Sequence, residues 1–456
     1  MTAARAFKRI FSPGGLRKIY LDHIHSKGAI GIDRIRPSRL EPILKSELEL
    51  ISRKTQDGSY SFTAFKERLI SKGQGKAPRV ISIPTARDRI CLRALCQLLG
   101  EIFPEAKLEL PHMAIESLSI ALASGKFTDY IKLDLESFYP SIPHTNLFSA
   151  LKKKIRKSEL LALLRAAVET PSVPENRGSK GSSPNVIGVP QGLAISNLLA
   201  EITLEPIDRI YKSRSDISYF RYVDDILILA PFGKANDIAD ELIKALKTLG
   251  LKPHLPSQPG SKSKIAPLSN PFTFLGYEVI NSGISIRRES VLKFEASLAR
   301  IFTSYRHRLR RASNLSERNR AIAICRWKLN LRITGCIFEG KRLGWVFYFS
   351  QITTTAPLRA VGHTIEVLMK RFGLAGVLKP KSLIKTYYES RRKNKLSHEY
   401  IPNFDIMSTP EKREILAILL GENRIAMIGD ERIDELFAMR ISIAVRELEA
   451  DLAGLS

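Results

Sequence analysis

The distribution of apolar and polar residues along the chain predicts a mixture of strands and helices. Short apolar runs bounded by turn residues predict strands over 130–135, 217–223 and 226–229. Stretches with apolar residues every three or four positions predict helices over 146–170, 193–211 and 234–249. The last two strands form a hairpin that turns at Asp224 and Asp225, and a loop rich in glycine, serine, proline and asparagine precedes the second helix at 171–185. This combination predicts a fold of the α+β class.

The regions on either side of this central part have different patterns. The first 110 residues mix short helical and strand-like stretches, and a basic loop beginning at Lys72 leads into a strand that ends at Ile83. After Gly283 the pattern becomes helical, with one amphipathic stripe at offsets of 4, 7 and 11 formed by Phe294, Leu298, Ile301 and Tyr305. A stripe of this kind faces a core, so we expect a long helix there with one buried face.

The composition is that of a folded globular protein. Of 456 residues, 44% are hydrophobic and 26% are charged, which excludes a disordered basic tail and favours two or three domains. No apolar run approaches the ~18 residues of a membrane span, and the N-terminal stretch lacks the apolar region of a secretion signal, so we expect a cytoplasmic protein with no membrane partner. The four cysteines and eight histidines show no zinc or redox spacing, and we expect buried free thiols.

The charge indicates a polyanionic partner. The formal net charge is +26, and nucleic acid is the favoured interpretation over an anionic membrane surface or a merely solvated face. This charge is concentrated: residues 287–342 carry 15 Lys or Arg against 4 acidic residues, whereas residues 411–456 carry 6 against 10. We therefore expect the basic segment to contact phosphates and the acidic C-terminal helices to form a surface for a partner protein, for self-association, or for an ordinary capping bundle.

Three aspartates lie where the predicted strands end. Asp134 comes at the end of the strand 130–135, and Asp224 and Asp225 lie between two apolar runs. Aspartate is common in turns, which alone would explain one of these residues. Adjacent acids on a buried sheet, however, repel each other unless a cation neutralises them. Carboxylates from separate strands can hold two Mg²⁺ ions about 3.5–4 Å apart, as in phosphoryl transfer, so the acids and the basic charge together indicate nucleotidyl transfer.

At this point the chain resembles the reverse transcriptases, over residues 10 to 290. Six segments carry the resemblance in order: SKGAIGIDRI, PRVISIPTARDRI, LDLESFYPSI, GVPQGLAISNLL, YVDD and FLGY. YVDD argues against RNA-templated RNA polymerases, which more often carry GDD. The resemblance implies a right-hand polymerase with fingers, a palm whose antiparallel sheet carries YVDD, a thumb and a C-terminal helical region. Residues 1–110 would form an N-terminal extension with fingers, and residues 111–290 the palm with part of the fingers. Residues 291–355 would form a basic helical thumb, and residues 356–456 a C-terminal helical domain.

The resemblance also implies roles for individual residues near the acids. Asp134, Asp224 and Asp225, with the backbone of Leu135, would hold two Mg²⁺ ions, for which Mn²⁺ is a possible substitute. The remaining residues implied to contact the incoming deoxynucleotide are Phe138, Tyr139 as the steric gate against a 2′-hydroxyl, Gln191, Val223 at the primer end, Arg79 on the triphosphate, Lys72 in competition with Lys76, and Lys262 or Lys264 as proton donor to pyrophosphate. An aromatic residue after a strand is also commonly a core residue, which is the alternative for Tyr139.

Nucleic-acid contacts are expected outside this site. In the fingers, Arg87 and Arg89 would support the fold or the template backbone. In and after the thumb, the candidates are Arg306, Arg310, Arg332, Thr334 and Lys341. Ile333-Thr334-Gly335 looks like the VTG-type element of retron thumbs, and the tail shows neither the His, Asn and Cys cluster of an intron-type nuclease nor the carboxylate set of an RNase H domain.

These features favour a bacterial defence-associated reverse transcriptase related to retron and abortive-infection enzymes. We expect it to copy RNA into DNA with dNTPs, working with a structured noncoding RNA in antiphage defence. Three alternatives remain open: protein-primed or template-independent synthesis at the same site, a retron or mobile-element enzyme, and an RNA-binding scaffold whose site is vestigial.

Overall fold

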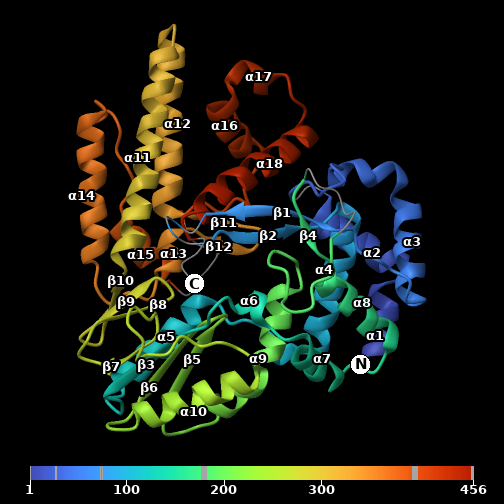
Figure 1. Ribbon diagram of the computed structural model, residues 1–456. Helices are drawn as coiled ribbons and strands as arrows, with labels where there is room; N and C mark the ends of the chain where they lie inside the picture. The colour runs from blue at the N-terminus through green and yellow to red at the C-terminus, as the bar shows by residue number, and fades with distance from the viewer. Residues whose placement is uncertain are drawn as a thin grey trace. The chain divides into compact units, whose positions relative to one another are not determined.

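The chain folds into two compact units in the computed structural model, which describes residues 2–25, 28–71, 73, 75, 77–175, 182–392 and 399–452 (Figure 1). Unit 1 comprises residues 1–109 and 127–266, and unit 2 comprises residues 110–126 and 267–456. Each unit contains helices and strands, which confirms the α+β class.

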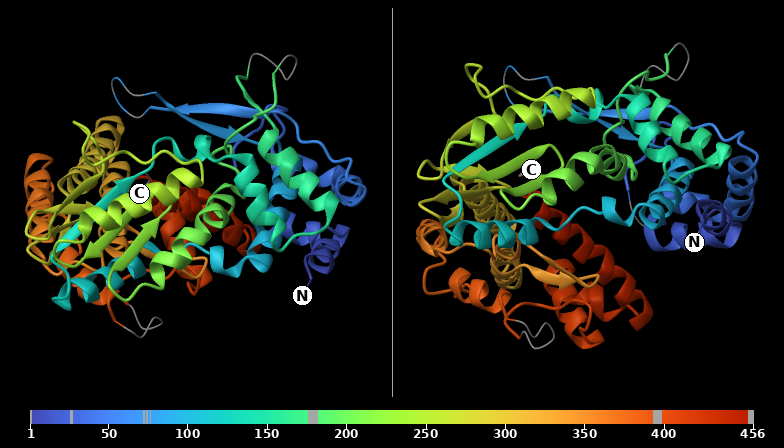
Figure 2. Two further views of the ribbon diagram at one scale, coloured as in Figure 1. Left: turned by 60° about the horizontal axis from the view of Figure 1, so that its bottom comes forward. Right: turned by 90° about the horizontal axis from the view of Figure 1, so that it is seen from below.

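Unit 1 is built around a four-stranded sheet in the order β5-β6-β3-β7. Its strands are β3 (Asp129–Asp134), β5 (Ser218–Tyr222), β6 (Asp225–Ala230) and β7 (Lys264–Pro267). Strand β6 runs antiparallel to both β3 and β5, and its residues from Ile226 to Ala230 are buried. Helix α10 (Ala235–Thr248) lies along this sheet and contacts β3, while α9 (Ser196–Lys212) contacts β5 (Figure 2). The predicted strands, their hairpin, and the helices predicted before and after the hairpin are thus confirmed near their expected bounds.

A second, three-stranded sheet of unit 1 has the order β2-β1-β4. Strands β1 (Phe65–Ile70) and β2 (Arg79–Ile83) are antiparallel, and β4 (Ser172–Val173) pairs in parallel with β1. The predicted strand ending at Ile83 is therefore confirmed. Strand β4 lies inside the segment 171–185 that we expected to be loop throughout, and that segment also includes residues outside the described ranges.

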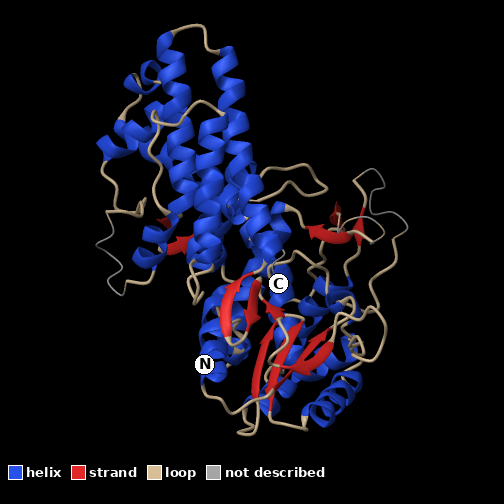
Figure 3. Cartoon of the chain, turned by 90° about the vertical axis from the view of Figure 1, so that its left-hand side faces the viewer, coloured by secondary structure: helices blue, strands red, loops and turns tan. Residues whose placement is uncertain are grey.

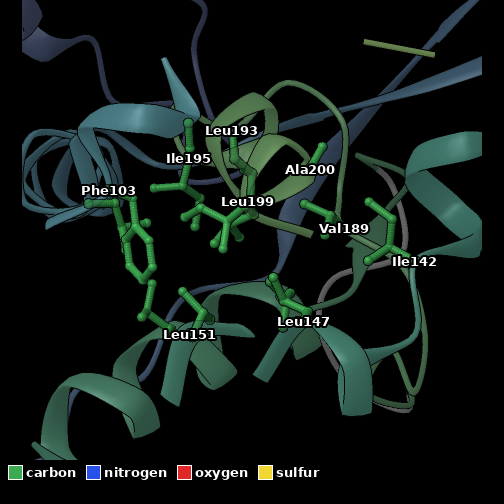
Figure 4. Close-up of a cluster of buried hydrophobic side chains, with 14 of the residues drawn as sticks. Phe103, Ile142, Leu147, Leu151, Val189, Leu193, Ile195, Leu199 and Ala200 are labelled. Atoms are coloured by element: carbon green, nitrogen blue, oxygen red, sulfur yellow. The ribbon is translucent and has the colours of Figure 1, made fainter. Parts of the chain in front are cut away.

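Helices pack around these sheets and form the core of unit 1. They are α1 (Ala3–Ile10), α2 (Pro13–Ile19), α3 (Leu44–Gln56), α4 (Ala86–Ile102), α6 (Phe138–Ser141), α7 (His144–Lys152) and α8 (Ser158–Glu169), with short 3₁₀ or π segments at Tyr20–Ile24, Pro37–Ile43 and Pro104–Ala106. The single helix expected over 146–170 is wrong, because the chain breaks between α7 and α8 to bury Ile155. Figure 4 shows Leu147 and Leu151 of α7 facing Leu199 of α9 in this core.

Unit 2 is largely helical. Its helices are α5 (Pro111–Ala123), α11 (Arg288–Arg311), α12 (Leu315–Thr334), α13 (Trp345–Tyr348), α14 (Ala356–Arg371), α15 (Leu383–Ser390), α16 (Thr409–Leu420), α17 (Glu422–Ala426) and α18 (Asp430–Glu449). The strands form an antiparallel sheet of β8 (Phe272–Phe274), β9 (Tyr277–Ile280) and β10 (Gly283–Ile286), and a hairpin of β11 (Cys336–Phe338) and β12 (Lys341–Leu343). Helices α11 and α12 lie side by side (Figure 1). Figure 3 distinguishes the helices of the chain from its strands by colour.

The amphipathic stripe of α11 packs as expected. Phe294 and Leu298 are fully buried, Tyr305 is 5% exposed, and the Phe294 ring stacks on Trp345 with ring centroids 4.3 Å apart. The four cysteines are free thiols, three of them buried and Cys96 partly so. Among the described residues, no helix is both long and apolar enough to cross a membrane.

Candidate active site

The three aspartates lie at one end of the four-stranded sheet. Asp134 is the last residue of β3 and pairs in register with Asp225, the first residue of β6. Asp225 also pairs with Tyr222, so Val223 and Asp224 alone form the turn between β5 and β6. The antiparallel register therefore brings together Asp134 and Asp225, which are 91 residues apart in the sequence.

The turn has an unusual backbone conformation at Val223. Its φ is +57°, in the left-handed region that β-branched residues rarely adopt. Such a conformation persists only when surrounding contacts hold it, and it is frequent at functional sites. The Val223 side chain packs against the core of unit 1, which is one of these contacts.

Burial is the main cause of the raised pKa values of Asp224 and Asp225. Burial raises the pKa of Asp225 to about 6, with Lys132 acting in the opposite direction. Burial likewise raises the pKa of Asp224; the charge of Asp134 adds to this, and Arg79 and Lys262 oppose it. Oδ1 of Asp225 is buried, and its ion-pair partner Lys132 Nζ lies 3.5 Å away, beyond an ordinary hydrogen bond. A divalent cation would relieve this repulsion and desolvation.

Asp134 is surrounded by the segment that precedes β7. Its Oδ2 lies 3.0 Å from Lys262 Nζ and 3.5 Å from His254 Nε2. Its backbone N–H donates to Ser263 Oγ over 3.0 Å, and its carbonyl accepts from the His254 N–H over 2.9 Å. Residue Leu135 forms a backbone bridge with Pro253. This segment fixes the backbone that carries the first acid.

The donor set suits a hard cation such as Mg²⁺, because carboxylate oxygens are its preferred protein ligands. Within the described ranges, no three His, Cys, Asp or Glu side chains already converge on a common point for a metal ion. Asp134 pairs with Lys262 through Oδ2 alone.

Tyr139 lies close to the acids at the start of the short helix α6. Its hydroxyl donates to Asn197 Oδ1 of α9 over 2.8 Å, and its ring centroid is 5.4 Å from that of Phe138. Burial raises the pKa of Tyr139, and the charge of Asp224 adds to this. Its carbonyl accepts from the Val189 N–H over 2.8 Å. The ring is therefore held by α9 on one side and by the Val189 segment on the other.

The segment around Gln191 is held against strand β2. The Ser82 N–H donates to the Gln191 carbonyl over 2.7 Å. Gly192 has φ +101°, and a Cβ there would lie 2.7 Å from Ile81 Cγ2, so only glycine fits. Arg79 begins the same strand and is exposed. Strand β2 thus carries Arg79 and holds Gln191 in place.

The other candidates around the site differ in their contacts. Lys262 contacts Asp134, whereas Lys264 is an exposed residue of β7; Lys72 and Lys76 lie outside the described residues. Arg87 donates to Glu47, with Nη2 at 2.7 Å from Oε1, and Arg89 donates to the Ala29 carbonyl over 2.7 Å. Both arginines therefore support the fold of unit 1.

The candidates in unit 2 fall into two groups. Arg306, Arg310 and Lys341 are exposed, as phosphate contacts require, although the Arg306 guanidinium also lies over the Phe372 ring at 5.4 Å. Arg332 and Thr334 are 7% and 1% exposed. Arg332 donates to backbone carbonyls at 447 and 448, and Thr334 to Asn330 and Gly335. Arg332 therefore links α12 to the end of α18, whereas the Thr334 bonds stay within α12 and the residue that follows it.

Several residues near the acids were missed in the sequence. Arg221 of β5 is buried and pairs with Glu201 and Asp208 of α9. The polar residues of α9 at 197, 201 and 208 share one helical face, and that spacing was the available signal. His254 and Ser263 carried no signal, since only the fold brings them to Asp134.

Comparisons with known proteins find similarities to several polymerases and related proteins. A family model described as reverse transcriptase (RNA-dependent DNA polymerase) matches residues 70–279. The chain is 24% identical over 363 residues to the protein YkfC of Escherichia coli, covering 66% of this chain and 92% of YkfC. It is 21% identical over 214 residues to the group II intron-encoded protein LtrA of Lactococcus lactis, covering 45% of this chain and 35% of LtrA. Among solved structures, a telomerase from Candida albicans is 13% identical with a TM-score of 0.44, covering 82% of this chain and 66% of that one.

Proposed function

We propose that the chain is an RNA-directed DNA polymerase in which Asp134, Asp224 and Asp225 bind two Mg²⁺ ions for deoxynucleotide addition. The match of residues 70–279 to the reverse transcriptase family model supports this proposal. The observation that carries this assignment is the β3–β6 register, which sets Asp134 opposite Asp225 with Asp224 on the adjoining turn. Bound metal ions would activate the primer hydroxyl and stabilise the charge on the departing pyrophosphate. The three carboxylates hold those ions, and the Leu135 carbonyl supplies a further oxygen.

The neighbouring residues bind and select the nucleotide in this proposal. Arg79 binds the triphosphate, since its planar fork can donate to two phosphate oxygens at once. Tyr139, fixed by Asn197, excludes a ribose 2′-hydroxyl by steric contact, and the Gln191 segment lies against the incoming nucleotide. Lys262 is the better candidate than Lys264 for donating a proton to pyrophosphate, because it already reaches Asp134 at 3.0 Å.

A primer-extension assay tests the proposal. Purified protein is incubated with Mg²⁺, a primed RNA template and labelled dNTPs, and Asp224→Asn is compared with Asp237→Asn. Asp237 is an exposed acid on α10 and serves as the matched control. We expect extension by wild type and Asp237→Asn only, and its loss on chelation with EDTA. Equal extension by Asp224→Asn, or none by wild type, would refute the assignment.

We further propose that this polymerase site works with a structured noncoding RNA in antiphage defence. Its support is the resemblance of residues 333–335 to the retron thumb element and the exposed basic residues Arg306, Arg310 and Lys341. Phage challenge of cells carrying wild type or Asp134→Ala tests it, with RNA and DNA sequenced from the immunoprecipitated protein. Protection that survives Asp134→Ala identifies a scaffold with a vestigial site, and peptide on the DNA 5′ end identifies protein priming.

A further inference from the structure

Arg221, the second-last residue of β5, lies in a buried ionic cluster next to the turn formed by Val223 and Asp224. Its side chain is only 2% exposed. It donates to Glu201 from Nη1 and Nη2 over 3.0 and 2.6 Å, and to Asp208 from Nε over 2.7 Å and from Nη2. The Tyr219 hydroxyl also donates to Asp208, over 2.9 Å. The two carboxylates therefore fix the plane of the guanidinium group.

One further hydrogen bond of Arg221 leads out of this cluster to the turn. Nη1 donates to the backbone carbonyl of Val223 over 2.9 Å. With two bonds to each acid and one to this carbonyl, all five N–H donors of the arginine are used. Four of them fix the position of the guanidinium group, and the fifth holds a backbone atom of the turn.

The held carbonyl belongs to the peptide group that joins Val223 to Asp224. Val223 is in the left-handed region at φ +57°, which a β-branched side chain disfavours. Without an external contact, the turn would relax towards a more usual conformation and rotate this peptide group. Rotation there changes the direction in which the Asp224 side chain leaves the backbone. Arg221 can therefore determine where this carboxylate points.

The anchor of the cluster is one face of α9. Asn197, Glu201 and Asp208 stand at offsets of 4 and 11, which place them on one stripe of a helix with 3.6 residues per turn. Asn197 accepts the Tyr139 hydroxyl at 2.8 Å, and the other two bind Arg221. A single helix thus holds both the Tyr139 ring beside the acids and the turn that carries Asp224.

We propose that Arg221 is a positioning residue: anchored on Glu201 and Asp208 of α9, it orients the Val223–Asp224 peptide and thereby the Asp224 carboxylate for catalysis. The inference rests on the proposed function, since it assigns Asp224 to the reaction. Lysine cannot replace arginine here, because its three donors on a single nitrogen cannot serve both acids and the Val223 carbonyl in fixed geometry.

The test compares Arg221→Lys with Arg214→Lys. Arg214 also binds two acids, but its hydrogen bonds go to the side chains of Asp216 and Glu241 instead of the turn. Single-nucleotide addition is measured against dNTP concentration, and amide hydrogen exchange is measured in peptides covering 218–230. We expect Arg221→Lys to lower kcat about 10–100-fold with the dNTP KM within about twofold, and to speed exchange in the hairpin. Arg214→Lys should change neither.

Three results separate the possible outcomes. Wild-type kcat and wild-type hairpin exchange in Arg221→Lys would overturn the inference, as would a loss of kcat no greater than in Arg214→Lys. If wild type itself does not extend a primer, the proposed function fails, and unchanged hairpin exchange in Arg221→Lys would still refute the positioning role separately. Should Arg221→Lys not fold, Glu201→Gln replaces one acceptor by an amide. It is expected to lower kcat in the same direction by about tenfold, and an unchanged kcat would overturn the inference.

Discussion

Replacing Gly192 by alanine should disturb both the stability of unit 1 and nucleotide binding. At this position φ is +101°, and a Cβ would lie 2.7 Å from Ile81 Cγ2 and 3.0 Å from the Ser82 carbonyl oxygen. The disfavoured backbone costs alanine about 1–2 kcal/mol, and overpacking against β2 adds about 1–3 kcal/mol. The unfolding free energy should therefore fall by about 2–5 kcal/mol.

The control is the same substitution at Gly100, near the end of α4. Nothing lies within 4 Å of a Cβ there, and the backbone is helical, so alanine should add about 0.5–1 kcal/mol of stability. Thermal unfolding followed by calorimetry should show a midpoint lowered by about 5–15 °C for Gly192→Ala and unchanged or raised for Gly100→Ala.

Gly192→Ala should also raise the KM for dNTP. The added Cβ pushes the Gln191 segment away from β2, which breaks the 2.7 Å hydrogen bond between the Ser82 N–H and the Gln191 carbonyl. Steady-state primer extension gives this value for each variant. Equal unfolding midpoints for the two alanine variants would refute the steric reasoning. A lowered midpoint with an unchanged KM would instead show that the contact is purely structural.

Three further predictions concern other parts of the molecule. Tyr139→Ala should reduce discrimination against ribonucleotides about tenfold or more, measured as the ratio of rNTP to dNTP incorporation, whereas Tyr139→Phe keeps the ring and should retain it. Trp345→Ala removes a side chain that is 2% exposed and stacked on Phe294, and should destabilise unit 2 by about 3–5 kcal/mol in calorimetry, with the partly buried Trp327→Ala costing less. Burial raises the pKa of Asp88 above its ordinary 3.8. The free energy of unfolding of wild type should therefore fall as the pH rises from about 4 through the folded-state pKa of Asp88, whereas Asp88→Asn lacks this titration. The stability of Asp88→Asn relative to wild type should rise over the same pH range, and a pH-independent difference would contradict this.

The strands and helices that carry the acids were predictable because their signals are local. The apolar runs around Asp134 and around Asp224 and Asp225 define β3, β5 and β6, and the two-residue spacing defines the turn. The break between α7 and α8 was not predictable from the same signals, because residues 153–157 continue the helical spacing of apolar residues. Only the core decides that Ile155 turns inward there.

Contacts between distant segments account for what else the sequence concealed. Nothing near Arg221 in the sequence identifies Glu201 and Asp208 as its partners, since the pairing depends on how α9 packs against β5. Strand β4 is only two residues long and forms by pairing with β1, which precedes it by about a hundred residues. Burial of Arg332 and Thr334 follows from the packing of α12, whereas their residue types alone suggested contact with nucleic acid.

The path of the chain between the two units constrains how the protein can be made and divided. Residues 110–126 belong to unit 2 but are synthesised between the two stretches that form unit 1. During translation, α5 therefore emerges before all the rest of the unit it joins, which begins at residue 267. Its apolar residues Ile115 and Leu118 are fully buried in the folded chain. A truncation after 266 would leave α5 without the rest of its unit, and a fragment beginning at 267 would lack the helix. Neither unit is encoded as one uninterrupted stretch of the chain.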